Sequence, residues 1–202
     1  DIDNNAINEA REIFKENKKY KFELKSIDEL DDNLKYDIIN LSYVLQHLEN
    51  TQEILIKLKN ELTDRGIIII KVPDDSFKFC YPDKKNLLHK IFNLYEKEIM
   101  KKQNITKYTD RYIGKKVYNY LVESNYNNIR LYYSVSDTIG KTREQRLSFF
   151  DSSIGFRSAI NKTNVSAQVK SEMEKLLNEL KKEFEKEDFY YTMTVLYYIG
   201  SK

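Results

Sequence analysis

The start of the chain shows two different spacings of hydrophobic side chains. Over residues 4–17 the apolar positions recur at helical spacing. Residues 20–25 alternate strictly between polar and apolar side chains, which indicates a half-buried strand. Residues 36–42 form a compact apolar run, which is typical of a strand buried in a parallel sheet. The pattern therefore predicts a helix followed by two strands.

A second helix and a strong strand follow. The helix is expected over residues 50–63, with Asn50 as its N-cap and Glu53 as the partner in a capping box. Residues 67–72 are the strongest strand signal in the chain, and we expect Pro73 to end that strand. Apolar strands separated by a helix favour right-handed crossovers and a parallel sheet.

The second half of the chain is richer in helix. Helices are expected over residues 85–103 and from a cap at Asp110 to about residue 124, followed by a strand over residues 129–135. Residues 141–186 are expected to be helical again, and residues 189–199 to form a final long strand. An apolar stripe marks one long amphipathic helix: Val165, Val169, Met173, Leu176, Leu177, Leu180 and Phe184.

Composition and charge argue against several classes of partner. The 202 residues carry 34 basic and 32 acidic side chains, and a net charge of +2 gives no argument for a nucleic acid or a membrane surface. No apolar run approaches the length that spans a bilayer. Cys80 is the single cysteine, so no intramolecular disulfide can form, which favours a reducing, cytoplasmic setting. Two distant histidines and scattered carboxylates lack metal-ligand spacing, so no metal is expected.

Several segments in the first part of the chain form a characteristic series. The chain starts with an acidic turn, Asp1-Ile2-Asp3, that leads directly into an apolar helix. The strand beginning Tyr36-Asp37-Ile38-Ile39 is followed by Ser42-Tyr43-Val44-Leu45-Gln46-His47-Leu48. A helix with Leu58 and Leu62, a turn at Gly66 and the run at residues 67–70 come next. The series resembles the second, fourth and fifth strands, with their following segments, of class I S-adenosylmethionine-dependent methyltransferases.

This resemblance implies an α/β fold of the Rossmann-like, doubly wound type. The sheet would be mostly parallel with an antiparallel last strand, and a helical lid would be inserted after the fifth and sixth strands. The core would comprise residues 1–72, 107–140 and 187–202. The acceptor-side lid would comprise residues 73–106 and 141–186.

The resemblance also implies a site for S-adenosylmethionine at the carboxyl ends of the strands. Asp1 would accept hydrogen bonds from the ribose hydroxyls, with Asp3 as an alternative acceptor or as the cap of the following helix. Ile2 would lie against adenine. Ser26 and Ile27 would reach the adenine edge, although the family often has Asp there. The residues expected at the methionine part are Asn40, Leu41 and Ser42, with Asn40 alternatively serving only to satisfy backbone groups at the strand end.

The glycine-rich loop of that family is missing from this sequence. The five glycines, at positions 66, 114, 140, 155 and 200, form no G-x-G. Without the strand that carries this loop, the sheet would have a gap of roughly 10 Å, two ladder spacings, between strands with unpaired edges. We therefore expect the natural protein to have residues upstream of Asp1.

Few residues are candidates for the acceptor side of the site. His47 is the best candidate for a base, because histidine titrates near neutral pH, and the alternative is a histidine that packs against loops. Tyr43 and Tyr81 would line the acceptor pocket or pack within the core. Arg143 and Arg146 share a helix face, and guanidinium groups recognise carboxylate and phosphate. An acidic acceptor is therefore one hypothesis, and a solvated charged surface is the other.

The function predicted from these observations is methyl transfer from S-adenosylmethionine to a small-molecule acceptor, by in-line displacement. The alternative is a non-catalytic binding or scaffold protein on the same fold, which Ser26 and the missing glycine loop favour. A nucleic-acid methyltransferase is disfavoured, because the acceptor-side segments carry mixed charge and residues 40–43, Asn-Leu-Ser-Tyr, do not match an Asn-Pro-Pro-Tyr-like motif.

Overall fold

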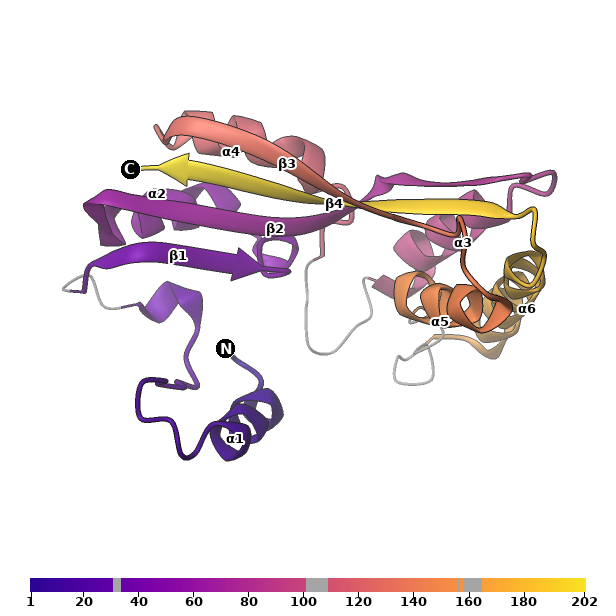
Figure 1. The fold of residues 1–202 in the computed structure, drawn as a ribbon, viewed down its shortest axis with the longest axis horizontal. Coiled ribbons are helices and arrows are strands. Elements are labelled where there is room, and N and C mark those ends of the chain that lie inside the picture. The colour runs from indigo at the N-terminus through magenta and orange to yellow at the C-terminus, as the bar shows by residue number, and fades with distance from the viewer. Residues whose placement is uncertain (31–33, 101–108, 156, 158–164) are drawn as a thin grey trace.

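A computed structural model describes the chain except for residues 31–33, 101–108, 156 and 158–164. Its centre is a four-stranded sheet of order β1-β2-β4-β3 (Figure 1). β1 runs parallel to β2, whereas β4 is antiparallel to both β2 and β3. β1, β2 and β3 therefore share one direction, which confirms the predicted mostly parallel sheet with an antiparallel last strand. The strands are β1 (Tyr36–Ser42), β2 (Leu62–Tyr81), β3 (Asn127–Asp137) and β4 (Tyr190–Ser201).

The helices form where the hydrophobic spacing predicts them, although several are shorter. Each named α-helix falls within a predicted helical segment, and the stretch expected to be helical from residue 141 to residue 186 contains two of them, α5 and α6. Short 3-10 or π turns connect the larger elements: η1 (Ile27–Glu29), η2 (Leu45–His47), η3 (Tyr95–Ile99) and η5 (Gly114–Lys116). The α-helices are α1 (Asn4–Ile13), α2 (Thr51–Glu61), α3 (Leu87–Leu94), α4 (Val117–Glu123), α5 (Arg143–Ser153) and α6 (Ala167–Phe184).

The predicted N-cap of α1 forms, whereas the predicted capping box of α2 does not. Asp3 caps α1, because its side chain accepts hydrogen bonds from the backbone N–H groups of Asn5 and Ala6. Asn50 precedes α2, but its side chain makes no capping hydrogen bond, so the predicted capping box is wrong. The hydroxyl of Thr51 donates instead to the carbonyl of Leu48, 2.8 Å away, and this bond holds the turn before α2.

Residues 20–25 do not form the predicted strand. A strand needs a neighbour for its backbone groups. Among the described residues, Asp1 supplies that neighbour only at the end of the segment: its carbonyl accepts from the Lys25 N–H at 2.9 Å and its amino group donates to the Glu23 carbonyl at 3.2 Å. The rings of Phe14, Tyr20 and Phe22 cluster beside it, with centroids 5.0–6.2 Å apart. The alternation of polar and apolar side chains in residues 20–25 was therefore not sufficient to predict a paired strand.

The strand β2 does not stop at Pro73, as the sequence suggested, but continues to Tyr81. Its pairing with β4 runs to Pro73, is interrupted by a bulge, and resumes at Lys78 opposite Met193. Proline lacks an N–H group and is tolerated in sheets at such irregularities. The extension means that the segment predicted to begin the lid is partly a continuation of the core sheet.

The α-helices other than α1 cover opposite faces of the sheet at its two ends (Figure 1). At one end α2 and α4 pack on the face that carries Ile68, Ile70 and Leu196. At the other end α3, α5 and α6 pack on Cys80, Tyr191 and Met193. Side chains alternate along a strand, and the β3–β4 pairing is regular over these positions, so odd and even residues of β4 face opposite ways. The hydrophobic residues thus form two clusters joined by continuous strands.

Candidate functional site

The carboxyl end of β1 presents polar side chains on one face and an apolar side chain on the other. Asn40 lies opposite Ile69, Leu41 opposite Ile70 and Ser42 opposite Lys71 in the register with β2. Leu41 is 5% exposed and belongs to the cluster beneath α2 and α4, so its side chain is part of the core and only its backbone can face a ligand. Asn40 and Ser42 are exposed on the other face.

Tyr43 turns the chain away from the sheet in an unusual conformation. Its φ angle is 57°, which is uncommon for a bulky residue, and its N–H donates to the carbonyl of Lys71 at 2.9 Å. The Tyr43 ring centroid lies 4.8 Å from the Lys71 ammonium. Strained residues of this kind persist where the surroundings hold them, and they cluster at functional sites.

Lys71 belongs to a row of side chains that crosses the whole sheet. Ser42, Lys71, Tyr197 and Tyr132 stand opposite one another on β1, β2, β4 and β3. The Lys71 ammonium lies 5.5 Å from the Tyr197 ring centroid. Hydrogen bonding to Tyr197 raises the pKa of Lys71 above its ordinary value, against the opposing effect of burial. The amine is therefore charged at neutral pH.

His47 ends η2, directly after the β1 end, and it is exposed. Its Nδ1 lies 3.1 Å from the Thr109 hydroxyl, and the neighbouring Gln46 carbonyl accepts from the Asp110 N–H at 2.8 Å. These contacts fix the turn against the segment that leads to α4. In the tautomer in which Nδ1 donates to Thr109, Nε2 is the proton acceptor that a base requires.

The structure brings Asp1 beside the segment that leads to Ser26 and Ile27. Asp1 Oδ1 accepts from the Asp3 N–H at 2.9 Å, and the carboxylate is exposed. The Ser26 hydroxyl caps η1 and donates to the Asp28 carboxylate at 3.0 Å. Ile2 is exposed, whereas Ile27 packs at the edge of the cluster beneath α2 and α4.

The remaining predicted acceptor residues lie at the other end of the sheet. Tyr81 ends β2 and is 74% exposed. Arg143 forms an exposed ion pair with Glu185 at 2.7 Å. Arg146 is buried, and its guanidinium donates to the backbone carbonyls of Lys141, Phe184 and Glu185 at 2.7–3.0 Å. These bonds join α5 to the end of α6, and they account for the position of Arg146 without an acidic ligand.

A buried ionic cluster, which the sequence did not indicate, joins the two ends of the molecule. Asp75, in the β2 bulge, lies 2.9 Å from Lys78, 2.9 Å from Arg111 and 2.7 Å from Arg157. Burial by itself would raise the pKa of Asp75, but the charges of Arg157, Lys78 and Arg111 hold that pKa well below its usual range. Burial lowers the pKa of Lys78 to about 8, although Asp75 opposes this change. The one signal in the sequence was the Asp pair that follows Pro73.

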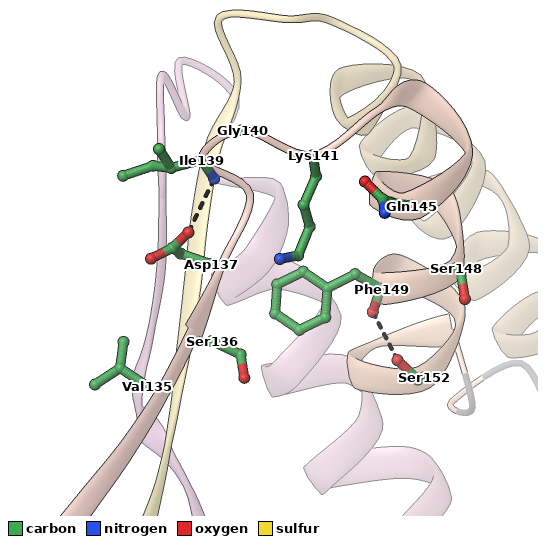
Figure 2. A pocket seen from close by; sticks show the side chains of 10 residues that line it. All are labelled: Val135, Ser136, Asp137, Ile139, Gly140, Lys141, Gln145, Ser148, Phe149 and Ser152. Atoms are coloured by element: carbon green, nitrogen blue, oxygen red, sulfur yellow. Dashed lines mark hydrogen bonds between the residues drawn. The ribbon is translucent and has the colours of Figure 1, made fainter.

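A cavity of about 680 Å³ lies between the end of β3 and α5, away from the row that contains Lys71. Figure 2 shows the Lys141 side chain extending over the ring of Phe149, and its ammonium lies 5.8 Å from the ring centroid. None of the predicted site residues lines this cavity. Its lining is Val135, Ser136, Asp137, Ile139, Gly140, Lys141, Gln145, Ser148, Phe149 and Ser152.

Two features are absent from the described residues. No helix there combines the length and the apolar character needed to cross a membrane. Within the same ranges, no group of three or more His, Cys, Asp and Glu side chains is arranged to hold a metal ion.

Comparisons with known proteins give matches to methyltransferases. A family model described as a methyltransferase domain matches residues 1–126. A protein from Bacillus halodurans C-125 assigned to the methyltransferases has a similar structure, with a TM-score of 0.57 at 11% identity over 100% of this chain and 80% of that chain. YcgJ from Bacillus subtilis gives 0.55 at 12%, with the same coverage. The mycolic acid cyclopropane synthase CmaA1, solved with SAH and CTAB, gives 0.54 at 10%, over 100% of this chain and 68% of that chain. Comparison with curated proteins gives no match.

Proposed function

The chain belongs to the methyltransferase-domain family, because the model of that family matches 126 of its 202 residues. We propose that it transfers a methyl group from S-adenosylmethionine to a small-molecule acceptor, as a class I enzyme. The observation that carries this proposal is the β1 end. Asn40 and Ser42 lie at the carboxyl end of β1, beside the parallel strand β2, and Tyr43 follows directly after them. Open α/β sheets bind ligands at the carboxyl ends of their strands.

Residues that could bind the adenosine part and the methionine part of the cofactor carry suitable polar and apolar groups. The exposed carboxylate of Asp1 would accept from ribose hydroxyls, with Ile2 against adenine. Ser26 and Ile27 lie next along the chain from Lys25, whose N–H is bonded to Asp1, and would contact the adenine edge through backbone groups. One neighbour of similar fold was solved with SAH, which supports the same cofactor class. Asn40 and Ser42 would hold the methionine part.

The chemistry asked of the protein is modest. The cofactor supplies an activated methyl group on a sulfonium, so the chain's own residues orient the acceptor and remove a proton where the acceptor needs it. We assign the base role to His47, because its imidazole is exposed in the turn that follows β1. Tyr43 would form one wall of the acceptor site.

Calorimetry with S-adenosylhomocysteine tests the cofactor site directly. We expect saturable binding by the wild-type chain and at least about tenfold weaker binding by Asp1→Asn, which loses a charge-assisted acceptor. Asp3→Asn is the matched control: it removes the same charge two residues away, keeps a good N-cap for α1, and should bind like the wild type. Equal loss in both variants would remove Asp1 from the site.

A non-catalytic scaffold on the same fold is the second candidate. One observation favours it: the Ser26 hydroxyl is already bonded to Asp28 at the expected adenine edge. The same titration separates the two functions. A chain that unfolds cooperatively, and is therefore folded, but binds no S-adenosylhomocysteine is a scaffold.

A further inference from the structure

The row formed by Ser42, Lys71, Tyr197 and Tyr132 contains one charge. Lys71 stands where β2 passes the end of β1, so its ammonium is beside the polar groups that end β1. Its neighbours across the sheet are aromatic, with Tyr197 on β4 and Tyr132 on β3. The row lies on the face opposite α2 and α4, and further along β4 this same face is covered by α3, α5 and α6. Lys71 therefore lies on the sheet face opposite α2 and α4, before the part of that face that α3, α5 and α6 cover.

The Lys71 ammonium is held by rings rather than by a carboxylate. Its contacts within the described ranges are with Tyr43, 4.8 Å from the ring centroid, and with Tyr197, 5.5 Å from the ring centroid. No carboxylate in those ranges forms an ion pair with it. Half-buried lysines are normally paired or solvated. An ammonium that is flanked by two phenol rings and is not neutralised by a described carboxylate is a suitable partner for an anion.

Four other cationic groups of the acceptor side have partners within the fold. Arg143 is paired with Glu185, and the Arg146 guanidinium bonds to three backbone carbonyls. Lys78 and Arg157 are almost fully buried around Asp75. Lys71, by contrast, stands beside the end of β1 and forms no ion pair with a carboxylate among the described residues.

We propose that Lys71 recognises a carboxylate or phosphate group on the methyl acceptor, with the rings of Tyr43 and Tyr197 forming the walls of that subsite. The inference rests on the proposed methyl transfer for the identity of the ligand, but the anion subsite itself is a property of the row. The left-handed conformation of Tyr43 is what brings its ring over the ammonium. The acceptor class is accordingly a small acidic molecule, recognised by Lys71 and not by Arg143 or Arg146.

The test follows the lysine side chains by NMR in the full chain with 13Cε-labelled lysine. The probes are benzoate, which has a carboxylate on an apolar ring, and inorganic phosphate, each added with and without saturating S-adenosylhomocysteine. Lys71→Met assigns the Lys71 signal. We expect that signal to move saturably with at least one probe. Lys115 is the matched control, because its ammonium also lies over a tyrosine ring, 4.9 Å from the Tyr112 centroid, and its signal should stay in place.

Two variants measure the charge requirement. Ligand-observed NMR of benzoate should show about tenfold weaker binding to Lys71→Met, which keeps the apolar stem, and substantial recovery in Lys71→Arg. A Lys71 signal that does not move, or that moves no more than Lys115, overturns the inference even if S-adenosylhomocysteine binds. If the Lys71 signal moves but S-adenosylhomocysteine does not bind, the anion subsite stands and the proposed methyl transfer fails.

Discussion

Replacing Asp75 by asparagine tests the buried ionic cluster. The side chains of Asp75, Lys78 and Arg157 are at most 3% exposed, and that of Arg111 is 12% exposed. Asp75→Asn keeps the shape of the side chain but leaves three cations without their shared carboxylate. Breaking a buried ion pair on one side typically costs about 3–5 kcal/mol, because the remaining charge is uncompensated. We expect a loss of that order in the free energy of unfolding.

The direction of the pKa shift of Asp75 determines the pH at which its full contribution to stability can be measured. The pKa of Asp75 is lower in the folded chain than in the unfolded chain, so its contribution to stability is fully present above the unfolded pKa and is lost as the pH falls toward the folded pKa. Urea unfolding at pH 7, followed by far-UV circular dichroism, therefore reports the whole contribution. Wild type and variant should converge in acid.

Asp151→Asn is the control for this measurement. Asp151 pairs with Lys181 at 2.9 Å, but both side chains are at least 40% exposed, so removing the charge should cost less than about 1 kcal/mol. The double variant Asp75→Asn with Lys78→Met should recover part of the loss, because it removes one of the three cations that shared the Asp75 carboxylate. An Asp75→Asn protein within about 1 kcal/mol of wild type at pH 7 would refute the view that the cluster joins the two ends of the molecule.

Three further predictions concern other groups. Lys78 has a pKa of about 8 in the folded chain against 10.5 for an ordinary lysine, so the unfolded chain binds more protons between these values. The unfolding free energy of wild type relative to Lys78→Met should therefore rise from pH 8 to pH 9.5 in urea titrations, and a falling difference would contradict this. At position 43, where φ is 57°, Tyr43→Gly should be more stable than Tyr43→Ala by about 1 kcal/mol in the same assay, whereas at Ser42 the order should reverse. His47→Ala should lower turnover about 10²–10⁴-fold with unchanged calorimetric affinity for S-adenosylhomocysteine, and unchanged turnover would remove the base role.

Much of the element order was accessible from local pattern. The strand at residues 36–42 was predicted with the bounds that the structure shows, and the strand at residues 67–72 lies within β2. The stripe from Val165 to Phe184 was predicted as one helix, and its residues pack in the cluster formed by α3, α5 and α6. These predictions succeeded because helical and strand periodicities are set by neighbouring residues along the chain. The antiparallel last strand came from the family resemblance and is confirmed.

The failures had a common physical origin. Residues 20–25 have the alternation of a strand, but a strand also needs a partner for its backbone groups, and the structure shows only the end of that segment bonded to Asp1. Pro73 is a strand breaker by itself, yet pairing with β4 on both sides of the bulge carries β2 past it. In both cases the presence or absence of a pairing partner distant in sequence decided the outcome.

The sequence by itself determined most of the helical and strand segments, the balance of charge and the family resemblance. Tertiary structure decided which side chains meet. It placed Lys71 between Tyr43 and Tyr197, gathered Lys78, Arg111 and Arg157 around Asp75, and tied Arg146 to backbone carbonyls. The reason is that periodicity fixes which face of an element a residue occupies, whereas the register between strands and the burial of charge depend on partners far away along the chain.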